Sequence, residues 1–339
     1  MPILPTDRMT DRGRQRVRLG PGAEFDLIRR FLESEGELPP QVRVGPGDDA
    51  AVIEGGWVIS TDLSIEDVHF RRAWLSDEEI GYRAGAAAIS DLAAMAATPV
   101  ALLLSLAAPR GGAVDVEAVH SGVRSVARSV GASVIGGDVS RSPGPLILDV
   151  VVLGCTAWPV LRDGAESGDE VWVTGALGAS AAAVHAWEAG EEPSAELRAA
   201  YAAPVPRVAE ACCLVEHEVV DALIDLSDGL VGDLGHVAAA SEVRITIETQ
   251  RVPTAPAAIT ALGEEDALQA ALRGGEDFEL AFVTGPGVVD ADYFADRYGL
   301  VLTRIGRVSE GEGVWLEDGA GAVRRTEEGG FDHWREVRT

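Results

Sequence analysis

Lysine is absent from this chain. Its 339 residues include 55 Asp plus Glu but only 28 Lys plus Arg, all of them arginine, which gives a formal net charge of −27 at pH 7. Without lysine the chain cannot form a P-loop nucleotide site, a protein-kinase site or a pyridoxal-phosphate Schiff base. The acidic balance also argues against non-specific nucleic-acid binding, which needs a basic face. Any bound nucleotide phosphate must therefore be neutralised by arginine and metal ions.

Metal-binding patterns of cysteine and histidine are also lacking. The three cysteines, Cys155, Cys212 and Cys213, have no metal-ligand spacing, and the adjacent pair is expected on a helix as small apolar residues. No run reaches the roughly 18 apolar residues of a membrane helix. The polar segment 12–20 does not resemble the apolar core of a signal peptide. We therefore expect a protein of the reducing cytoplasm that does not bind a membrane.

The length and the 47% apolar composition allow one large or two medium-sized domains. Residues 1–22 are expected to form a disordered, Arg-rich tail. Helical and strand patterns then alternate, which predicts a mixed α/β (α+β) fold with a boundary at Ala157–Pro159 and domains at 23–157 and 158–339. Predicted helices cover 23–33, 77–97, 114–130, 177–188, 206–216 and 230–240, and predicted strands cover 50–53, 57–60, 101–107, 133–135, 146–155, 170–174, 244–247 and 280–283.

Six short segments place an acidic residue beside Gly, Ser or Thr. Val58 and Ile59, for example, are typical of a buried strand, and an Asp at the end of that strand, Asp62, would project a carboxylate from the rim of a sheet. Several such rims together would form a pocket of carboxylate and hydroxyl oxygens, which are the ligands that Mg²⁺ prefers. The segments are GPGDDAAVI (45–53), VISTD (58–62), AISDLAAM (88–95), VIGGD (134–138), LIDLSDGL (223–230) and GGEDFEL (274–280).

Each segment also has a simpler explanation. Asp beside Gly and Ser is common in turns, and Asp91, which precedes an apolar LAAMAA stretch, fits a helix cap. For any one segment alone, a turn or a cap is the better explanation. Six such segments in a chain with few cations favour metal binding, because buried carboxylates are costly unless they are paired or metal-bound.

Taken in order, GDDAAV, STD with a histidine seven residues later, SDLAAM, IGGD, DLSDGL and GGED resemble the thiamine-monophosphate kinase family. That family belongs to the AIR-synthetase-like (PurM-like) ATP-binding superfamily. The resemblance covers nearly everything from about residue 23 to the C-terminus. It implies a two-domain PurM-like fold whose N-terminal domain forms a β-barrel at a homodimer interface, with ATP and several Mg²⁺ ions bound between the domains.

The resemblance implies roles for individual residues at the nucleotide. Arg162 and Ser227 would contact ATP phosphates, and Gly137 would let the nucleotide approach the backbone next to Asp138. The implied Mg²⁺ ligands are Asp49, Ser60, Thr61, Asp62, Asp91, Asp138, Asp225 and Asp228.

Three further residues, His69, Glu276 and Phe331, are placed by the resemblance at the thiamine substrate. Phe331 can stack on an aromatic ring, and Glu276 can accept a hydrogen bond from an aminopyrimidine or balance the cationic thiazolium. Taken alone, each has a plainer alternative: a surface loop for His69, a solvated turn for Glu276 with Asp277, and packing for an aromatic residue near the C-terminus.

The implied reaction is direct transfer of the γ-phosphoryl group of ATP to thiamine monophosphate, which gives thiamine diphosphate without a phospho-enzyme. The acceptor is a phosphate monoester whose second pKa is about 6, so it is largely dianionic near neutral pH and no catalytic base is expected. Two alternatives stay open. One is another enzyme of the superfamily, such as selenophosphate synthetase, AIR synthetase or the hydrogenase-maturation ATPase, and the other is a non-catalytic, acidic metal-binding dimer.

The charge balance resembles that of halophilic proteins, although a GC-rich genome can also replace lysine with arginine. If the acidic surface is adapted to salt, molar KCl should raise the melting temperature in the absence of Mg²⁺. The reason is that the Debye length falls from about 30 Å at 0.01 M salt to about 3 Å at 1 M, which screens acid–acid repulsion. Thermal melts in KCl and in sulfate at matched ionic strength separate screening from strengthened apolar burial. A melting temperature that does not change with KCl contradicts the halophilic interpretation.

Overall fold

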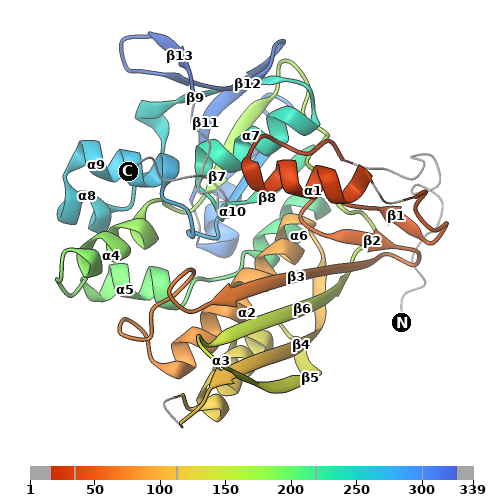
Figure 1. Cartoon of the computed structure of the whole chain (residues 1–339). Coiled ribbons are helices and arrows are strands. Elements are labelled where there is room, and N and C mark those ends of the chain that lie inside the picture. Colours follow the sequence, from red (N-terminus) through yellow and green to blue (C-terminus); the bar gives the residue numbers. More distant parts are fainter. Residues whose placement is uncertain (1–16, 34–35, 112–113, 218–219, 300, 327–339) are drawn as a thin grey trace.

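The computed structural model describes residues 17–33, 36–111, 114–217, 220–299 and 301–326. Two β-sheets, one in each half of the chain, form a mixed α/β fold, as the sequence predicts (Figure 1). Of the segment expected to be a tail, residues 1–16 lie outside the described part, and Val17 is buried against Gly47. Among the described residues, no helix has both the length and the apolar character needed to span a membrane.

The N-terminal sheet has six strands in the order β1-β2-β3-β6-β4-β5, so β5 is an edge strand. Neighbouring strands are antiparallel except β4 and β5, which are parallel. Its strands are β1 (Val42–Val44), β2 (Ala51–Ile53), β3 (Trp57–Ile65), β4 (Thr98–Pro109), β5 (Ser133–Ser142) and β6 (Ile147–Cys155), and the helices of this half are α1 (Ala23–Glu33), α2 (Asp77–Ala94) and α3 (Val116–Ser129).

The C-terminal sheet has seven strands in the order β13-β12-β9-β11-β7-β10-β8, with β12 and β9 parallel. Its strands are β7 (Glu170–Thr174), β8 (Ala222–Asp225), β9 (Arg244–Glu248), β10 (Leu280–Thr284), β11 (Leu302–Ser309), β12 (Gly313–Glu317) and β13 (Val323–Arg325). Its helices are α4 (Ala179–Glu188), α5 (Ala195–Ala202), α6 (Val208–Glu216), α7 (Leu230–Ala240), the 3₁₀ turn η1 (Thr249–Arg251), α8 (Pro256–Leu262), α9 (Glu264–Arg273) and α10 (Ala291–Tyr298).

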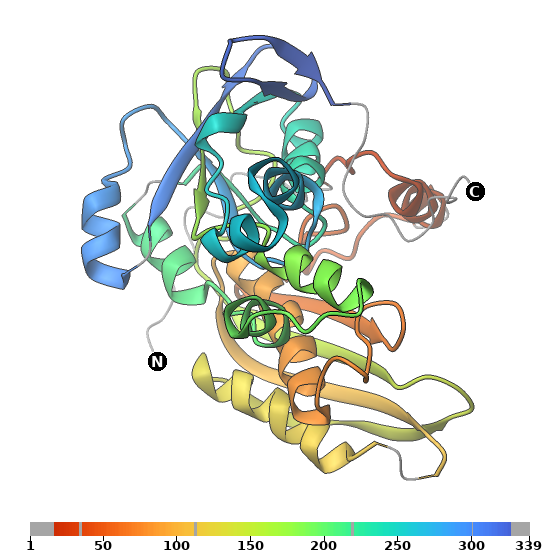
Figure 2. The ribbon, with the colours of Figure 1, turned by 90° about the vertical axis from the view of Figure 1, so that its left-hand side faces the viewer.

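Helices α2 and α3 cover one face of the N-terminal sheet, and no described helix covers its other face (Figure 2). Strand β6 shows this two-sidedness, because Leu148, Val150 and Val152 are fully buried whereas the residues between them are only half-buried. Such alternation is typical of a strand with one face in the core. The sheet therefore leaves one face and the edge strand β5 open within a single chain.

Helix α2 lies between the two sheets and carries side chains of the site described below. It contacts β3 and β6 on one side and β8 on the other. Of its 18 residues, 13 are buried, and most of these are Ala or Gly, so neighbouring backbones approach closely. A Cβ on Gly81 would lie 1.9 Å from the carbonyl oxygen of Val119, and one on Gly122 of α3 would lie 1.9 Å from that of Glu78.

Several predicted elements agree with the structure, and α1, β7 and α7 begin and end at the predicted residues. Strands β3 and β5 are longer than predicted, because they continue to Ile65 and Ser142. Asp62 and Asp138 therefore lie inside strands, and the prediction that such residues end their strands at the rim of a sheet is wrong for these two. Polar residues that follow an apolar run fit either the end of a strand or a longer strand with one face open. A periodicity read over only four residues does not distinguish these two possibilities.

The close crossing of α2 and α3 gives a stability prediction. The variant Gly122→Ala should lower the free energy of unfolding by about 1–3 kcal/mol, because the added methyl group overlaps the α2 backbone. The matched control is Gly235→Ala in α7, where an added Cβ meets nothing within 4 Å. It should raise stability by about 0.5–1 kcal/mol, since alanine is the better helix former. Urea unfolding measures both, and equal effects of the two variants would contradict the packing described here.

Candidate functional site

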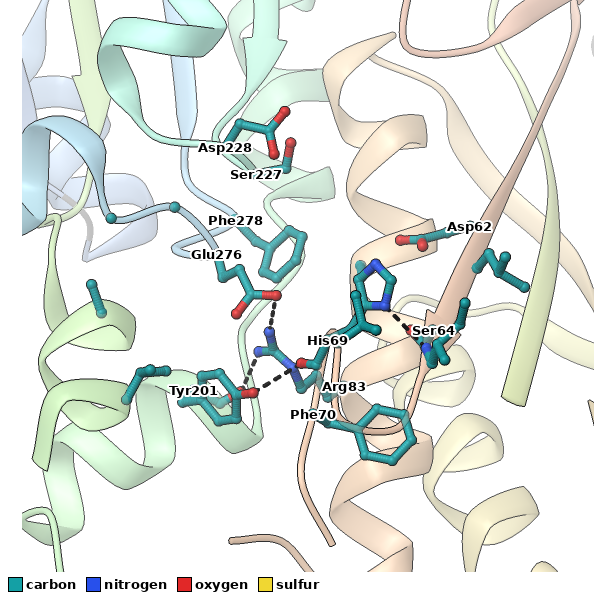
Figure 3. A pocket seen from close by; sticks show the side chains of 18 of the residues that line it. Asp62, Ser64, His69, Phe70, Arg83, Tyr201, Ser227, Asp228, Glu276 and Phe278 are labelled. Carbon is teal, nitrogen blue, oxygen red and sulfur yellow. Dashed lines mark hydrogen bonds and ion pairs between the residues drawn. The ribbon is translucent and has the colours of Figure 1, made fainter. Parts of the chain in front are cut away.

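A cavity of about 1000 Å³ lies between the two halves of the chain. Its lining comes from β3 and the loop after it, α2, α4, α5, the end of β8 and the loop after it, the segment 274–278, and Glu24 of α1. Figure 3 shows Ser227, Asp228, Glu276 and Phe278 on one side of the cavity, Asp62, Ser64 and His69 on the other, and Arg83 and Tyr201 below them. Residues from both halves of the chain therefore meet in one space.

Three carboxylates gather at one end of this space. Asp49 comes from the loop between β1 and β2, Asp91 from the interior of α2, and Asp225 from the last position of β8. Each offers an oxygen within 4.8 Å of the other two, a spacing that suits a shared cation. Asp91 lies in the fourth turn of α2, so the alternative that it caps this helix is wrong.

Burial and mutual repulsion raise the pKa values of two carboxyl groups of this cluster, those of Asp91 and Asp225. The pKa of Asp225 rises to about 8, first because of burial and then because of Asp49. Burial, Asp225 and Asp49 raise the pKa of Asp91 well above its ordinary value. These carboxyl groups therefore favour either a proton or a cation over free ionisation.

Arg162 is the cation that pairs with this cluster. Its guanidinium binds the Asp49 carboxylate through two N–H groups, one of them Nε at 3.0 Å from Oδ2. Its backbone N–H donates to Asp48 at 3.1 Å. Burial, followed by Asp49, raises the pKa of Asp48 to about 7, although Arg162 opposes the shift. One arginine thus faces at least four carboxyl groups, which leaves the cluster short of positive charge.

Strand β3 divides its polar run between two faces. Ser60 faces α2, and its hydroxyl donates to Asp91 at 2.6 Å. Asp62 shares this face, and burial raises its pKa to about 6, with Arg83 opposing and Glu276 adding to the shift. Thr61 has the opposite orientation, as strand geometry requires, and its hydroxyl donates to Asp149 on β6. Ser60 and Asp62 therefore share one face of β3, and the Thr61 hydroxyl is turned away from that face. Asp62 and Thr61 line the cavity, whereas Ser60 is directed to Asp91.

A second acidic group forms where β8 leads into α7. Asp228, Asp233 and His236 each offer a ligand atom within 4.8 Å of the others. Asp233 accepts hydrogen bonds from the backbone N–H groups of Asp228 and Gly229, at 3.2 and 3.0 Å, so it shapes the turn that presents Asp228. Burial, and then Arg162, lowers the pKa of His236 to about 3. The sequence analysis did not single out Asp233 and His236, although their three-residue spacing on a helix was a usable signal.

The GGEDFEL segment divides its acidic residues between the cavity and the fold. Glu276 forms an ion pair with Arg83 at the cavity wall. Asp277 turns the other way and accepts hydrogen bonds at the start of α4, from the N–H of Gly178 at 2.8 Å. Glu279 is buried with Arg207 and binds its Nε at 2.8 Å. The alternative of a solvated turn is therefore wrong for Asp277 and does not describe Glu276.

His69 lies in the loop after β3 and is held at both ends. Its Nδ1 accepts a hydrogen bond from the backbone N–H of Ile65 at 3.0 Å, so the neutral ring carries its proton on Nε2. Its carbonyl oxygen accepts a hydrogen bond from the Tyr201 hydroxyl at 2.9 Å. The ring lines the cavity, so the alternative of a plain surface loop residue does not describe it (Figure 3).

The remaining residues singled out from the sequence lie elsewhere. Gly137 and Asp138 are exposed on the edge strand β5, level with Leu104 and Ser105 of β4, and they do not line the cavity. Ser227 lines the cavity, and its carbonyl accepts the N–H of Glu276 at 2.8 Å. Phe331 lies outside the described residues.

Arg83, Tyr201 and Phe278 line the cavity but were not singled out from the sequence. Arg83 is the one basic residue of an otherwise small-residue and acidic helix, which was a signal for a buried ion pair. Phe278 stands two residues after Glu276 in the same motif. Tyr201 carries no local signal, because its contacts with residues 69 and 83 are distant in sequence.

Comparisons with known proteins show the family to which the chain belongs. Residues 47–156 match the AIR synthase related protein N-terminal domain, and residues 166–318 match the corresponding C-terminal domain. Thiamine-monophosphate kinase of Rhodopirellula baltica is 36% identical over 317 residues, which cover 89% of this chain and 95% of that protein.

Two solved structures are similar over most of their length. Thiamine-monophosphate kinase from Stenotrophomonas maltophilia K279a has a TM-score of 0.73 and 36% identity, and the match covers 90% of this chain and 98% of that one. AaThiL complexed with AMPPCP and TMP has a TM-score of 0.78 and 30% identity, covering 92% and 97%. On these grounds, the chain belongs to the thiamine-monophosphate kinase family.

Proposed function

We propose that this protein transfers the γ-phosphoryl group of ATP to thiamine monophosphate and releases thiamine diphosphate and ADP. The observation that carries the proposal is the cavity between the two halves, in a chain of this family. At one end it presents the Asp91 and Asp225 carboxylates, with the buried pair of Asp49 and Arg162 next to them, which suits polyphosphate and its cations. At the other end it presents Glu276 among aromatic side chains, which suits an aromatic ring that carries a hydrogen-bond donor.

The acceptor oxygen needs no base from the protein. A phosphate monoester has a second pKa of about 6 and is largely dianionic at neutral pH. The barrier lies in bringing two polyanions together and in stabilising the charge of a loose transition state. We therefore assign no catalytic acid or base, and the carboxylates of the site serve to bind cations rather than to exchange protons.

We propose that the carboxylate cluster holds several Mg²⁺ ions. The fit rests on buried oxygen donors that lack sufficient positive charge and whose pKa values are raised. When bound, Mg²⁺ neutralises the phosphates and holds the attacking and leaving oxygens in line. The proposed ligands are the side chains named from the sequence, with Thr61 contributing only if its hydroxyl leaves Asp149: Asp49, Ser60, Thr61, Asp62, Asp91, Asp138, Asp225 and Asp228.

The other residues of the site bind and orient. Arg162 and Ser227 are proposed to contact ATP phosphates, and Arg162 already lies at the metal end of the cavity through its ion pair with Asp49. His69 and Glu276 are proposed to contact thiamine monophosphate, together with Phe331. The hydrogen bond from Ile65 to His69 Nδ1 leaves the Nε2 proton of the ring as its donor.

We further propose that the protein is a homodimer whose N-terminal sheets close into a β-barrel. Two features support this. In the described part of the chain strand β5 pairs with β4 alone, and exposed apolar side chains such as Leu63, Ile135 and Val139 lie on its edge or on the open face. An exposed apolar edge strand is usually paired or covered. Gly137 and Asp138 lie on β5, so we propose that their contact with ATP depends on this assembly. From its composition we also propose that the protein is cytoplasmic and adapted to high salt.

The substrate assignment predicts a clear preference. ADP release should require thiamine monophosphate, and the kcat/KM for free thiamine should be lower by roughly 100-fold or more. The reason is that the hydroxyl group of thiamine lacks the anionic phosphate that the site holds and is not already ionised. A coupled ADP assay at high KCl, with chromatography of the products, measures this. Turnover of thiamine in the absence of turnover of the monophosphate would contradict the proposal.

The raised pKa values predict how Mg²⁺ stabilisation depends on pH. Asp62, Asp48 and Asp225 have folded-state pKa values of about 6, 7 and 8, above the ordinary 3.8, so the folded state binds more protons than the unfolded state between about pH 4 and pH 8. The metal-free protein should lose stability as pH rises through this window. Mg²⁺ binds the ionised carboxylates, so it should raise the melting temperature by several degrees at pH 8 and clearly less at pH 6.

Thermal melts of protein treated with a chelator, with and without millimolar Mg²⁺, test this expectation. The variant Asp225→Asn should remove most of the Mg²⁺ effect at pH 8. The control is Asp296→Asn, which changes the same charge at an exposed position on α10 and should leave the effect intact. An Mg²⁺ effect that is independent of pH, or unchanged in Asp225→Asn, contradicts the metal assignment.

A further inference from the structure

Arg83 is a buried cation in the wall of the cavity, at the end away from the carboxylate cluster. Only 5% of this residue is exposed, and it lies on the second turn of α2. A buried charge is tolerated when it is paired and hydrogen-bonded. An arginine beside the proposed binding place of a cationic substrate would repel that substrate unless its charge is balanced. The contacts of Arg83 show how it is balanced.

Three groups from two other segments hold the Arg83 guanidinium (Figure 3). One terminal nitrogen, Nη2, pairs with Oε1 of Glu276. The other, Nη1, donates to the carbonyl oxygen of Tyr201 at 2.6 Å. The guanidinium carbon lies 3.8 Å from the centre of the Tyr201 ring, which adds a cation–π contact. The guanidinium is thus fixed by Tyr201 and turns one N–H edge toward Glu276.

The Glu276 backbone is fixed as well. Glu276 has φ of +60° and Phe278 has φ of +49°, conformations that cost about 1–3 kcal/mol each in non-glycine residues and persist only where the surroundings impose them. The N–H of Glu276 donates to Ser227 at 2.8 Å, and the N–H of Phe278 donates to Leu226 at 2.9 Å. The segment is therefore held against the end of β8, and Glu276 extends from it toward Arg83.

The geometry leaves one carboxylate oxygen of Glu276 for another partner. The ion pair with Arg83 uses Oε1, and the side chain is 32% exposed while that of Arg83 is only 6% exposed. A carboxylate has acceptor sites on both oxygens. Arg83 also cancels the charge of Glu276, so this end of the cavity presents an oriented acceptor rather than a general attraction for cations.

We propose that Arg83, held by Tyr201, is a positioning residue that orients Glu276 to accept a hydrogen bond from the exocyclic amino group of the substrate's aminopyrimidine. This inference rests on the function proposed above and names how that site selects its substrate. In a pyrimidine with a carbonyl oxygen in place of the amino group, that oxygen would face the carboxylate oxygen of Glu276. Both are hydrogen-bond acceptors, so no hydrogen bond would form between them. Sites that leave a buried polar group unpaired discriminate strongly between such analogues.

The test compares variants by the ratio of kcat/KM for thiamine monophosphate to that for its oxo analogue, oxythiamine monophosphate. Arg83→Met should lower this ratio and raise the KM for thiamine monophosphate by about tenfold or more, because Glu276 loses its orientation. The KM for ATP should change by no more than roughly twofold, because the substitution does not touch the phosphate end of the cavity. Arg83→Lys should fall between Arg83→Met and the unmodified protein, since an ammonium group can pair with Glu276 but lacks the planar fork.

A matched control separates positioning from simple bridging of the two halves. Arg198 of α5 also links the halves, through an ion pair with Glu79 and a hydrogen bond to the Trp74 carbonyl at 3.0 Å, but it does not line the cavity. Arg198→Met should lower the melting temperature without changing the discrimination ratio. In the double variant Arg83→Met with Glu276→Gln, the ratio should equal that of Glu276→Gln alone, because the two residues act as one unit.

The outcomes distinguish this inference from the function itself. If the unmodified protein uses thiamine monophosphate and folded Arg83→Met keeps the ratio within about twofold, or if the KM values for both substrates rise together, Arg83 is only a structural bridge and the inference is wrong. If Arg83→Met does not fold, Arg83→Lys decides by the same ratio. If the unmodified protein shows no release of ADP that depends on thiamine monophosphate, the proposed function is wrong and the inference fails with it.

Discussion

The site depends on carboxylates that are buried close together with too little positive charge to balance them. Asp49, Asp91 and Asp225 come from a loop, a helix and a strand and meet within 4.8 Å, with Arg162 as their paired cation. Their repulsion disfavours the metal-free, ionised state, which is why burial and neighbouring acids raise the pKa of Asp225 to about 8. This cost is the physical reason for proposing that the site binds cations and the polyphosphates that carry them.

The need to bring these carboxylates together explains the composition of α2. The helix must approach both sheets to bring Asp91 to Asp225, so its buried face consists largely of Ala and Gly. It also carries Arg83, eight residues before Asp91, which corresponds to about 12 Å along a helix. One rigid element therefore sets the separation between the ring-binding end and the phosphate-binding end of the cavity. This fixed separation suits a substrate with an aromatic cation at one end and a phosphate at the other.

The sequence predicted the elements with strong local patterns, and it failed where distant contacts decide. Helix α7 and strand β7 followed from periodicity, and three of the proposed metal ligands do meet in space. The roles of adjacent residues were not predictable, because the GGED motif does not tell that Glu276 faces the cavity while Asp277 caps α4. Nor does local sequence connect Arg83 to Tyr201, since the two residues lie 118 positions apart in the chain.

The absence of lysine is consistent with what Arg83 does. At this position one side chain pairs with Glu276, donates to the Tyr201 carbonyl and stacks on the Tyr201 ring. Only a planar guanidinium offers separate N–H groups for the first two contacts and a flat face for the third. The two ends of the cavity thus use charge in opposite ways. Among the carboxylates Asp49, Asp91 and Asp225 the negative charge exceeds that of Arg162, which is the basis for the proposed cation binding. At the other end Arg83 balances Glu276, which is the basis for the proposal that one oriented oxygen selects the substrate.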